Sequence, residues 1–118
     1  MSVRGIGVDV VDVERFAASL ERTPTLRQRL FTPAEATLST ESLAARFAAK
    51  EAFVKALRAP AGMSWTDIEV VTDDRGAPSF ALHDQAAARV RDLGITGLHL
   101  SISHDGPVAT AFVVAEAD

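Results

Sequence analysis

The chain begins with a pattern that predicts a β-strand. In "VRGIGVDVV", residues 3–11, apolar side chains alternate with glycine or aspartate, the period of two that is typical of strands. Gly5, Gly7 and Asp9 share one face. Because the two glycines have no side chain, a ligand or another segment of backbone can approach that face closely.

The pattern then changes to a helical period. We expect Asp12 to be an N-cap and residues 13–20 to form a helix, whose apolar stripe consists of Val13, Phe16, Ala17 and Leu20. Thr23-Pro24 begins a further short helix. Thr32 and Glu35 have the spacing of a capping box, which predicts a third helix start.

A long helix is predicted from Glu41 to Arg58, ending before Pro60. Its apolar stripe consists of Leu43, Phe47, Val54 and Leu57. Lys50 interrupts this stripe, and Glu51 lies at its edge. A helix that only had to pack would carry an apolar residue at position 50, so we interpret the interruption as a candidate binding feature.

The second half of the chain predicts antiparallel strands and one helix. Strands are expected at 66–72, 79–82, 97–103 and 108–116, and a helix at 84–93 that Gly94 ends. Asp105-Gly106 predicts a tight hairpin turn between the last two strands. Hairpin connections indicate the α+β class, with an antiparallel sheet packed by the long helix.

The last strand is bulky on both faces, with Phe112, Val113 and Val114 in succession. Either another subunit covers its second face or the core of a monomer does.

Length and composition narrow the function classes. The 118 residues predict one domain, 1–118. The absence of cysteine excludes disulfides and thiolate metal sites. The chain shows no signal peptide and no membrane span, so we expect a cytoplasmic protein that binds no membrane. A net charge of −4 argues against broad nucleic-acid binding.

A local excess of positive charge occurs at Arg22, Arg27 and Arg29, with Glu21 as the only acid nearby. Such a cluster suits docking to an acidic partner. The alternative is a solvated helix face.

Several polar residues at element edges form a candidate site. Asp9 and Glu51 are carboxylates, and two carboxylates in a chain without cysteine suggest Mg²⁺, which prefers oxygen ligands. The cations Arg46, Lys50 and Lys55 would then face phosphate oxygens. Each residue alone also has an ordinary structural explanation, as does His104 at a strand end. The residues by themselves therefore indicate Mg²⁺-dependent phosphate chemistry and no particular reaction.

The motifs "GIGVDVVDVERF", "ARFAAKEAFVKAL" and "LSISHDGPVATAFVVAE", in this order, resemble the small 4′-phosphopantetheinyl transferases, the holo-acyl-carrier-protein synthase family. The resemblance spans nearly the whole chain. It implies a magnesium-dependent transfer of 4′-phosphopantetheine from coenzyme A to a serine of an acidic apo acyl carrier protein, with release of adenosine 3′,5′-bisphosphate. It also implies a homotrimer with active sites between subunits, acting in fatty-acid or related biosynthesis.

The resemblance assigns roles to individual residues. Asp9 and Glu51 match the two metal-binding carboxylates, and Glu51 and Lys55 would take part in catalysis. His104 would close the cofactor site from the neighbouring subunit, and Arg22, Arg27 and Arg29 lie where the family docks its carrier protein. The residues expected to contact coenzyme A are Arg15, Arg46, Lys50, Lys55 and His104.

Two departures from the family pattern affect the prediction. The loop after the long helix reads "RAPAGMSW", with one glycine and a proline, which leaves the contacts to the adenine end open. The stretch between Glu35 and Arg46 is shorter than in many members.

The residue that accepts the serine proton is left open. The candidates are Glu51 acting through a bound water, a metal-bound water, and Glu35, which is equally explained as a capping-box acid.

Two other functions fit the same residues. One is a different Mg²⁺-dependent phosphate enzyme, such as a small nucleotide hydrolase. The other is a non-catalytic trimer that binds coenzyme A or an acidic partner.

Overall fold

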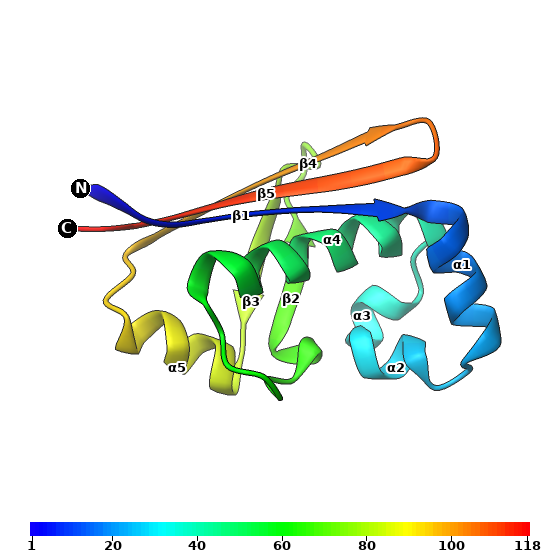
Figure 1. The fold of residues 1–118 in the computed structure, drawn as a ribbon, viewed down its shortest axis with the longest axis horizontal. Helices are drawn as coiled ribbons and strands as arrows, with labels where there is room; N and C mark the ends of the chain where they lie inside the picture. The colour runs from blue at the N-terminus through cyan, green and yellow to red at the C-terminus, as the bar shows by residue number, and fades with distance from the viewer.

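The computed structural model describes all of residues 1–118 and has the predicted α+β class. A three-stranded antiparallel sheet has the order β1-β5-β4, and β2 and β3 form a separate antiparallel hairpin. In Figure 1 the larger sheet forms one layer, the long helix α4 lies against it, and the β2–β3 hairpin and the short helices cover the other side of α4. The strands are β1 (Ser2–Asp12), β2 (Ile68–Thr72), β3 (Pro78–Leu82), β4 (Gly97–Asp105) and β5 (Val108–Ala117).

The helices gather at the two ends of α4 (Figure 1). α1 (Val13–Arg22), α2 (Leu26–Leu30) and α3 (Pro33–Ala36) lie at one end, and α5 (Asp84–Asp92) lies at the other. A 3₁₀ turn, η1 (Trp65–Asp67), leads into β2. Both predicted helix starts are present: the Asp12 side chain accepts from the Arg15 N–H at 2.9 Å, and Thr32 and Glu35 form the capping box.

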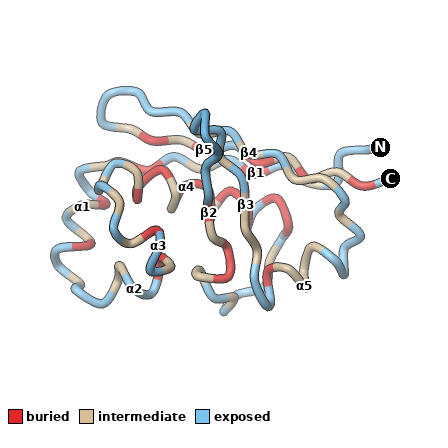
Figure 2. The backbone as a smooth tube through the Cα atoms, turned by 180° about the vertical axis from the view of Figure 1, so that it is seen from behind, coloured by how far each residue is buried: buried red, intermediate tan, exposed pale blue.

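α4 (Thr40–Leu57) is buried on more sides than the predicted single stripe. Ten of its residues are buried, six of them alanines that the apolar stripe did not include. The sheet covers one side of the helix and the other elements cover the opposite side (Figures 1 and 2). A helix enclosed in this way must be apolar nearly all round, and alanine lets its neighbours come close.

The two glycines of β1 admit the backbone of α4, which is one of the two alternatives drawn from the sequence. A Cβ atom on Gly7 would collide with the carbonyl group of Ala52, and one on Gly5 would collide with that of Ala56. β1 and α4 therefore pack almost backbone to backbone, which brings residues just beyond the glycines on β1 close to the middle of α4.

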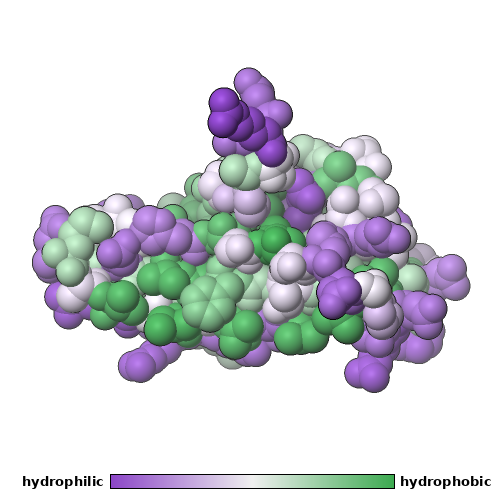
Figure 3. Space-filling model, turned by 90° about the horizontal axis from the view of Figure 1, so that it is seen from above, coloured by the Kyte–Doolittle hydropathy of each residue, from purple (hydrophilic) through white to green (hydrophobic).

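The outer face of the larger sheet is apolar and exposed. Side chains of β1 and β5 form this face, which we call the outer sheet face, and Figure 3 shows it as a band of hydrophobic atoms. Its large exposed residues are Val3, Ile6, Val8, Val10 and Phe112. The core of this chain therefore does not cover the second face of the last strand, whereas Val113 on the inner face is fully buried.

No helix of this chain is both long enough and apolar enough to span a membrane.

Candidate functional site

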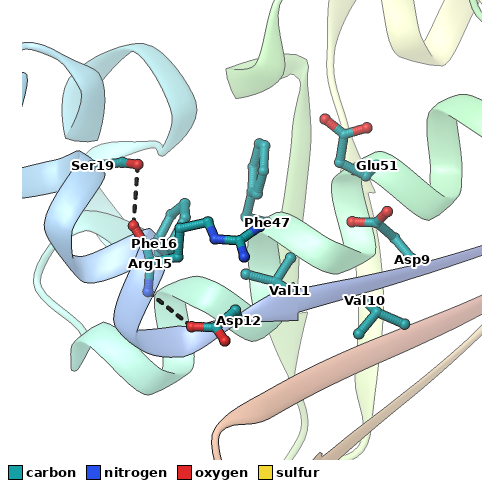
Figure 4. Close-up of a pocket in the computed structure, with 9 residues that line it drawn as sticks. All are labelled: Asp9, Val10, Val11, Asp12, Arg15, Phe16, Ser19, Phe47 and Glu51. Carbon is teal, nitrogen blue, oxygen red and sulfur yellow. Dashed lines mark hydrogen bonds between the residues drawn. The ribbon is translucent and has the colours of Figure 1, made fainter.

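A cleft of about 360 Å³ lies where β1 runs into α1, beside the middle of α4. Figure 4 shows two carboxylates on one side of it and an arginine entering from α1 on the other. The lining residues are Asp9, Val10, Val11, Asp12, Arg15, Phe16, Ser19, Phe47 and Glu51.

Asp9 and Glu51 come from different elements and meet at this cleft (Figure 4). Asp9 follows Gly7 on the inner face of β1, where the close approach of α4 brings Glu51 nearby. Desolvation by burial raises the pKa of Glu51, the negative charge of Asp9 raises it further, and Lys55 partly offsets both. The two predicted carboxylates are therefore close enough to repel each other.

Lys55 lies one helical turn after Glu51 and pairs with Asp9. Its Nζ donates to Asp9 Oδ1 at 3.1 Å and to the Val8 carbonyl oxygen at 2.9 Å. The side chain is 52% exposed, so one N–H of the ammonium stays available to a further acceptor at the surface.

The donor set fits a hard divalent cation. Asp9 and Glu51 offer carboxylate oxygens, and burial together with the charge of Asp9 raises the pKa of Glu51, both of which a bound cation would offset. No group of three or more His, Cys, Asp or Glu side chains gathers anywhere in the chain. Mg²⁺ suits such a site, because it commonly takes one or two protein carboxylates and completes its shell with water and substrate phosphates.

The aromatic wall of the cleft was not predicted. Phe16 and Phe47 stack with ring centroids 5.3 Å apart and line the cleft beside Arg15, which reaches into it from α1 (Figure 4). The sequence had placed both rings only in apolar stripes. The spacing alone does not distinguish a stripe that is fully covered from one whose edge remains open to solvent.

Lys50 is the residue that the structure places differently from the prediction. Its side chain is 0% exposed and its Nζ lies 2.7 Å from Glu35 Oε1, so a ligand in the cleft cannot reach the ammonium. The prediction that Lys50 contacts coenzyme A is corrected on this ground. Lys50 points into the protein because Glu35 neutralises its charge there, which a helical projection of α4 could not reveal.

Glu35 is likewise removed from the candidates for proton acceptor. Its side chain is 2% exposed, Oε1 accepts from the Thr32 N–H, and Oε2 accepts from the Val70 N–H at 2.9 Å. The capping-box interpretation is confirmed, and the same carboxylate also serves Lys50.

The other predicted ligand contacts lie outside the cleft lining. Arg46 is half-buried, and its Nε is the only buried side-chain nitrogen or oxygen without a hydrogen-bond partner. His104 is exposed at the end of β4, next to the turn into β5. Within this single chain, His104 is not among the residues that line the cleft.

The three arginines of the predicted docking patch have unequal surroundings. Arg27 is half-buried and donates to the Ala36 carbonyl oxygen at 3.0 Å. Arg22 and Arg29 are exposed, and Arg29 borders a second cleft of about 330 Å³ formed largely by residues 59–65. That cleft contains the "RAPAGMSW" loop that departs from the family pattern.

The arrangement suits the chemistry of a phosphate ester. Two carboxylates can hold a divalent cation, while Arg15 lines the same cleft and Lys55, outside the lining, pairs with Asp9. Cations on both sides of a transferring phosphoryl group stabilise the charge that develops on its oxygens.

Sequence comparison with known proteins finds similarity over nearly the whole chain. The family model of the "4′-phosphopantetheinyl transferase superfamily" matches residues 5–110. A holo-acyl-carrier-protein synthase of Clavibacter michiganensis is 60% identical over 116 residues, covering 98% of each chain. A protein of the same name from Frankia alni is 57% identical over 118 residues, covering 99% of this chain and all of the other.

Solved structures agree with these sequence similarities. The holo-acyl-carrier-protein synthase of Neisseria meningitidis superposes with a TM-score of 0.89 at 31% identity, covering 98% of this chain and 99% of the other. A synthase described as the Chronobacterium ammoniagenes complex with coenzyme A has a TM-score of 0.86 at 34% identity, covering 100% and 99%.

Proposed function

Because this chain belongs to the 4′-phosphopantetheinyl transferase superfamily, we propose that it is a holo-acyl-carrier-protein synthase. It transfers 4′-phosphopantetheine from coenzyme A to a serine of an apo acyl carrier protein and releases adenosine 3′,5′-bisphosphate. The names of relatives that are 57–60% identical over nearly the whole chain support this activity. The observation that carries the proposal is the meeting of Asp9 and Glu51 at one cleft, with Lys55 paired to Asp9 beside it.

Asp9 and Glu51 would hold Mg²⁺, which when bound supplies positive charge to the pyrophosphate oxygens of coenzyme A. Both carboxylates must be ionised to do so, and the repulsion between them is relieved once a cation lies between them. Glu51 is also the candidate to accept the serine proton, through a water molecule, because its carboxylate lines the cleft.

Lys55 and Arg15 would bind the phosphates of coenzyme A from opposite sides of the cleft. Lys55 pairs with Asp9 in this structure, and its ammonium would donate to a phosphate oxygen if Asp9 served as a metal ligand instead. Arg46 is half-buried outside the cleft lining and would contact the same ligand only through the exposed part of its guanidinium. Lys50 takes no part in these contacts.

The outer sheet face is the proposed subunit interface of a homotrimer. Exposed apolar side chains at Ile6, Val8, Val10 and Phe112 lie together on neighbouring strands, and contiguous exposed apolar patches mark interaction sites. His104, at the tip of the β4–β5 hairpin, would then reach the cleft of a neighbouring subunit.

The family model covers most of the chain, which supports treating residues 1–118 as one transferase domain. We propose a cytoplasmic location for the enzyme.

One assay separates this function from its competitors. The protein is mixed with Mg²⁺, coenzyme A and an apo acyl carrier protein, and the carrier is analysed by intact-mass spectrometry. We expect the carrier to gain the mass of phosphopantetheine on its serine, and adenosine 3′,5′-bisphosphate to accumulate. Binding of coenzyme A without a covalent product would instead indicate a non-catalytic module, and nucleotide hydrolysis without a carrier would indicate a hydrolase.

A further inference from the structure

We infer that the buried Lys50–Glu35 ion pair positions the aromatic wall of the active-site cleft. The inference rests on the proposed function, since it concerns the transfer reaction at the same cleft. Lys50 would act through other residues, and it is therefore a positioning residue rather than a catalytic one.

The first observation is how many segments the pair joins. Lys50 Nζ donates to Glu35 Oε1 at 2.7 Å, to the Leu30 carbonyl oxygen at 2.8 Å and to the Trp65 carbonyl oxygen at 3.2 Å. The carboxylate of Glu35 accepts two further backbone hydrogen bonds, from Thr32 and Val70. One ion pair thus fixes the end of α2, the start of α3, η1 and β2 against α4.

The second observation is that two of these anchored carbonyls flank the aromatic wall. Phe31 directly follows Leu30 in the chain. The centroid of its ring lies 5.1 Å from Lys50 Nζ. The same ring packs edge-on against Phe16, with the two ring centroids 6.1 Å apart. The Trp65 ring lies 5.6 Å from that of Phe47. Phe16 and Phe47 are the rings that line the cleft.

The contacts therefore form a continuous path from the buried charge to the cleft. Lys50 fixes the backbone at Leu30 and Trp65, the rings of Phe31 and Trp65 support Phe16 and Phe47, and α1 carries Arg15 beside Phe16. Glu51 is the next residue of α4 after Lys50. The spacing between Arg15 on one side of the cleft and Glu51 on the other depends on this path.

An apolar side chain at position 50 could fill the same volume, and neutralising Glu35 as well removes the uncompensated buried charge that makes loss of one partner so destabilising. What a neutral side chain cannot reproduce is three simultaneous hydrogen bonds from one atom to three segments. If the ion pair serves only stability, a double variant that neutralises both residues should regain its transfer rate together with its stability. If the pair positions the cleft, the rate should stay low.

The test uses the full chain with Lys50→Met, Glu35→Gln and the double variant. Glu35→Gln is nearly isosteric and keeps an acceptor for one backbone N–H, so it is the mildest of the series. The matched control is Phe80→Leu, which perturbs the contact between buried Phe53 and half-buried Phe80, neither of which lines the cleft. Each variant is assayed at a temperature at which far-ultraviolet circular dichroism shows it to be folded.

We expect kcat/KM for transfer to fall at least about tenfold in every folded variant of the pair, because small displacements of positioning groups are costly in rate. The double variant should regain thermal stability without regaining this rate. Trp65 is the only tryptophan, so its fluorescence emission should shift in the same variants and stay unchanged in Phe80→Leu.

Wild-type kcat/KM in a folded Lys50→Met, Glu35→Gln or double variant would overturn the inference, as would an equal loss in Phe80→Leu at the same change in melting temperature. Unchanged Trp65 emission throughout the series would also overturn it. Failure of the proposed function is seen separately, because it would abolish transfer by the wild-type protein while leaving the fluorescence comparison intact.

Discussion

At the scale of single residues, the ionised carboxylate of Glu51 destabilises the metal-free protein, although the proposed function requires it. Its carboxylate is partly desolvated and faces the charge of Asp9, and both effects raise its pKa. A raised pKa means that the folded protein holds this proton more tightly than the unfolded chain does. In the absence of metal, the ionised carboxylate therefore lowers the free energy of unfolding at neutral pH.

Glu51→Gln should accordingly stabilise the metal-free protein while removing activity. We expect a higher melting temperature than wild type at pH 7. The difference should shrink as the pH falls through the raised pKa and disappear below the ordinary value of 4.5, where wild-type Glu51 becomes protonated in both states. Transfer should fall by at least about 100-fold, since a lost metal ligand removes several kcal/mol of charge stabilisation.

Differential scanning calorimetry across pH and the mass-spectrometric transfer assay measure these two effects. A Glu51→Gln protein that transfers at the wild-type rate in limiting Mg²⁺ would remove Glu51 from the metal site. Asp9→Asn provides the companion measurement, because it should raise the Mg²⁺ concentration needed for turnover. A lower melting temperature of Glu51→Gln at pH 7 would contradict the argument that the Glu51 charge destabilises the metal-free protein, but it would not contradict the metal role of Glu51.

At the scale of elements, the contact between β1 and α4 creates the site. Gly5 and Gly7 let the helix backbone reach the strand, and this approach is what places Asp9 of the strand beside Glu51 and Lys55 of the helix. The site is therefore sensitive to any added volume between the two elements.

Gly7→Ala should destabilise the protein, because its Cβ would meet the Ala52 carbonyl group. Overpacking of this kind typically costs about 1–3 kcal/mol, measurable by urea unfolding. Gly97→Ala on β4 is the matched control, since a Cβ there meets nothing closer than 3.5 Å. It should be neutral or slightly stabilising, and equal losses at the two positions would argue against the close-packing explanation.

The exposed arginines of α1 and α2 form the proposed docking surface for the carrier. Charge reversal at Arg22 and Arg29 should raise the KM for the carrier protein and flatten its dependence on salt, because long-range attraction to an acidic partner is lost. Arg27→Glu should instead lower the melting temperature, since Arg27 is half-buried and bonded to Ala36. Unchanged salt dependence in Arg22→Glu/Arg29→Glu would make these residues an ordinary solvated face.

At the scale of the whole molecule, the outer sheet face leaves apolar side chains exposed to solvent in the single chain. Its exposed side chains belong to β1 and β5 (Figure 3), and β1 also lines the cleft. Subunit association on this face would therefore bring a neighbouring chain to the edge of the active site.

Phe112→Glu should convert the proposed trimer into folded monomers, because a charge buried in an apolar interface without a partner is strongly unfavourable. Sedimentation velocity measures the mass of the assembly, and circular dichroism verifies the fold. Val71→Glu is the control, as Val71 is an exposed apolar residue of β2, outside this sheet. A wild-type protein that sediments as a monomer would refute the trimer, and so would a Phe112→Glu protein of unchanged mass.

The sequence by itself determined the local structure of this protein. The alternating pattern of residues 3–11, the caps at Asp12 and Thr32, the long helix before Pro60 and the turn at Asp105-Gly106 all appear in the structure within a few residues of the predicted bounds. These features depend on neighbours along the chain, through side-chain periodicity, capping and turn chemistry. The motifs also indicated Asp9 and Glu51, which the structure brings to one cleft.

Only the tertiary structure decided which charged side chains face a ligand and which face the core. Lys50 and Glu51 are adjacent in sequence, yet one is enclosed by Glu35 and two carbonyl groups while the other opens onto the cleft. The aromatic wall was hidden in apolar stripes for the same reason. Burial of a charge depends on a partner 15 residues away in the chain, and no local pattern records which distant groups will meet.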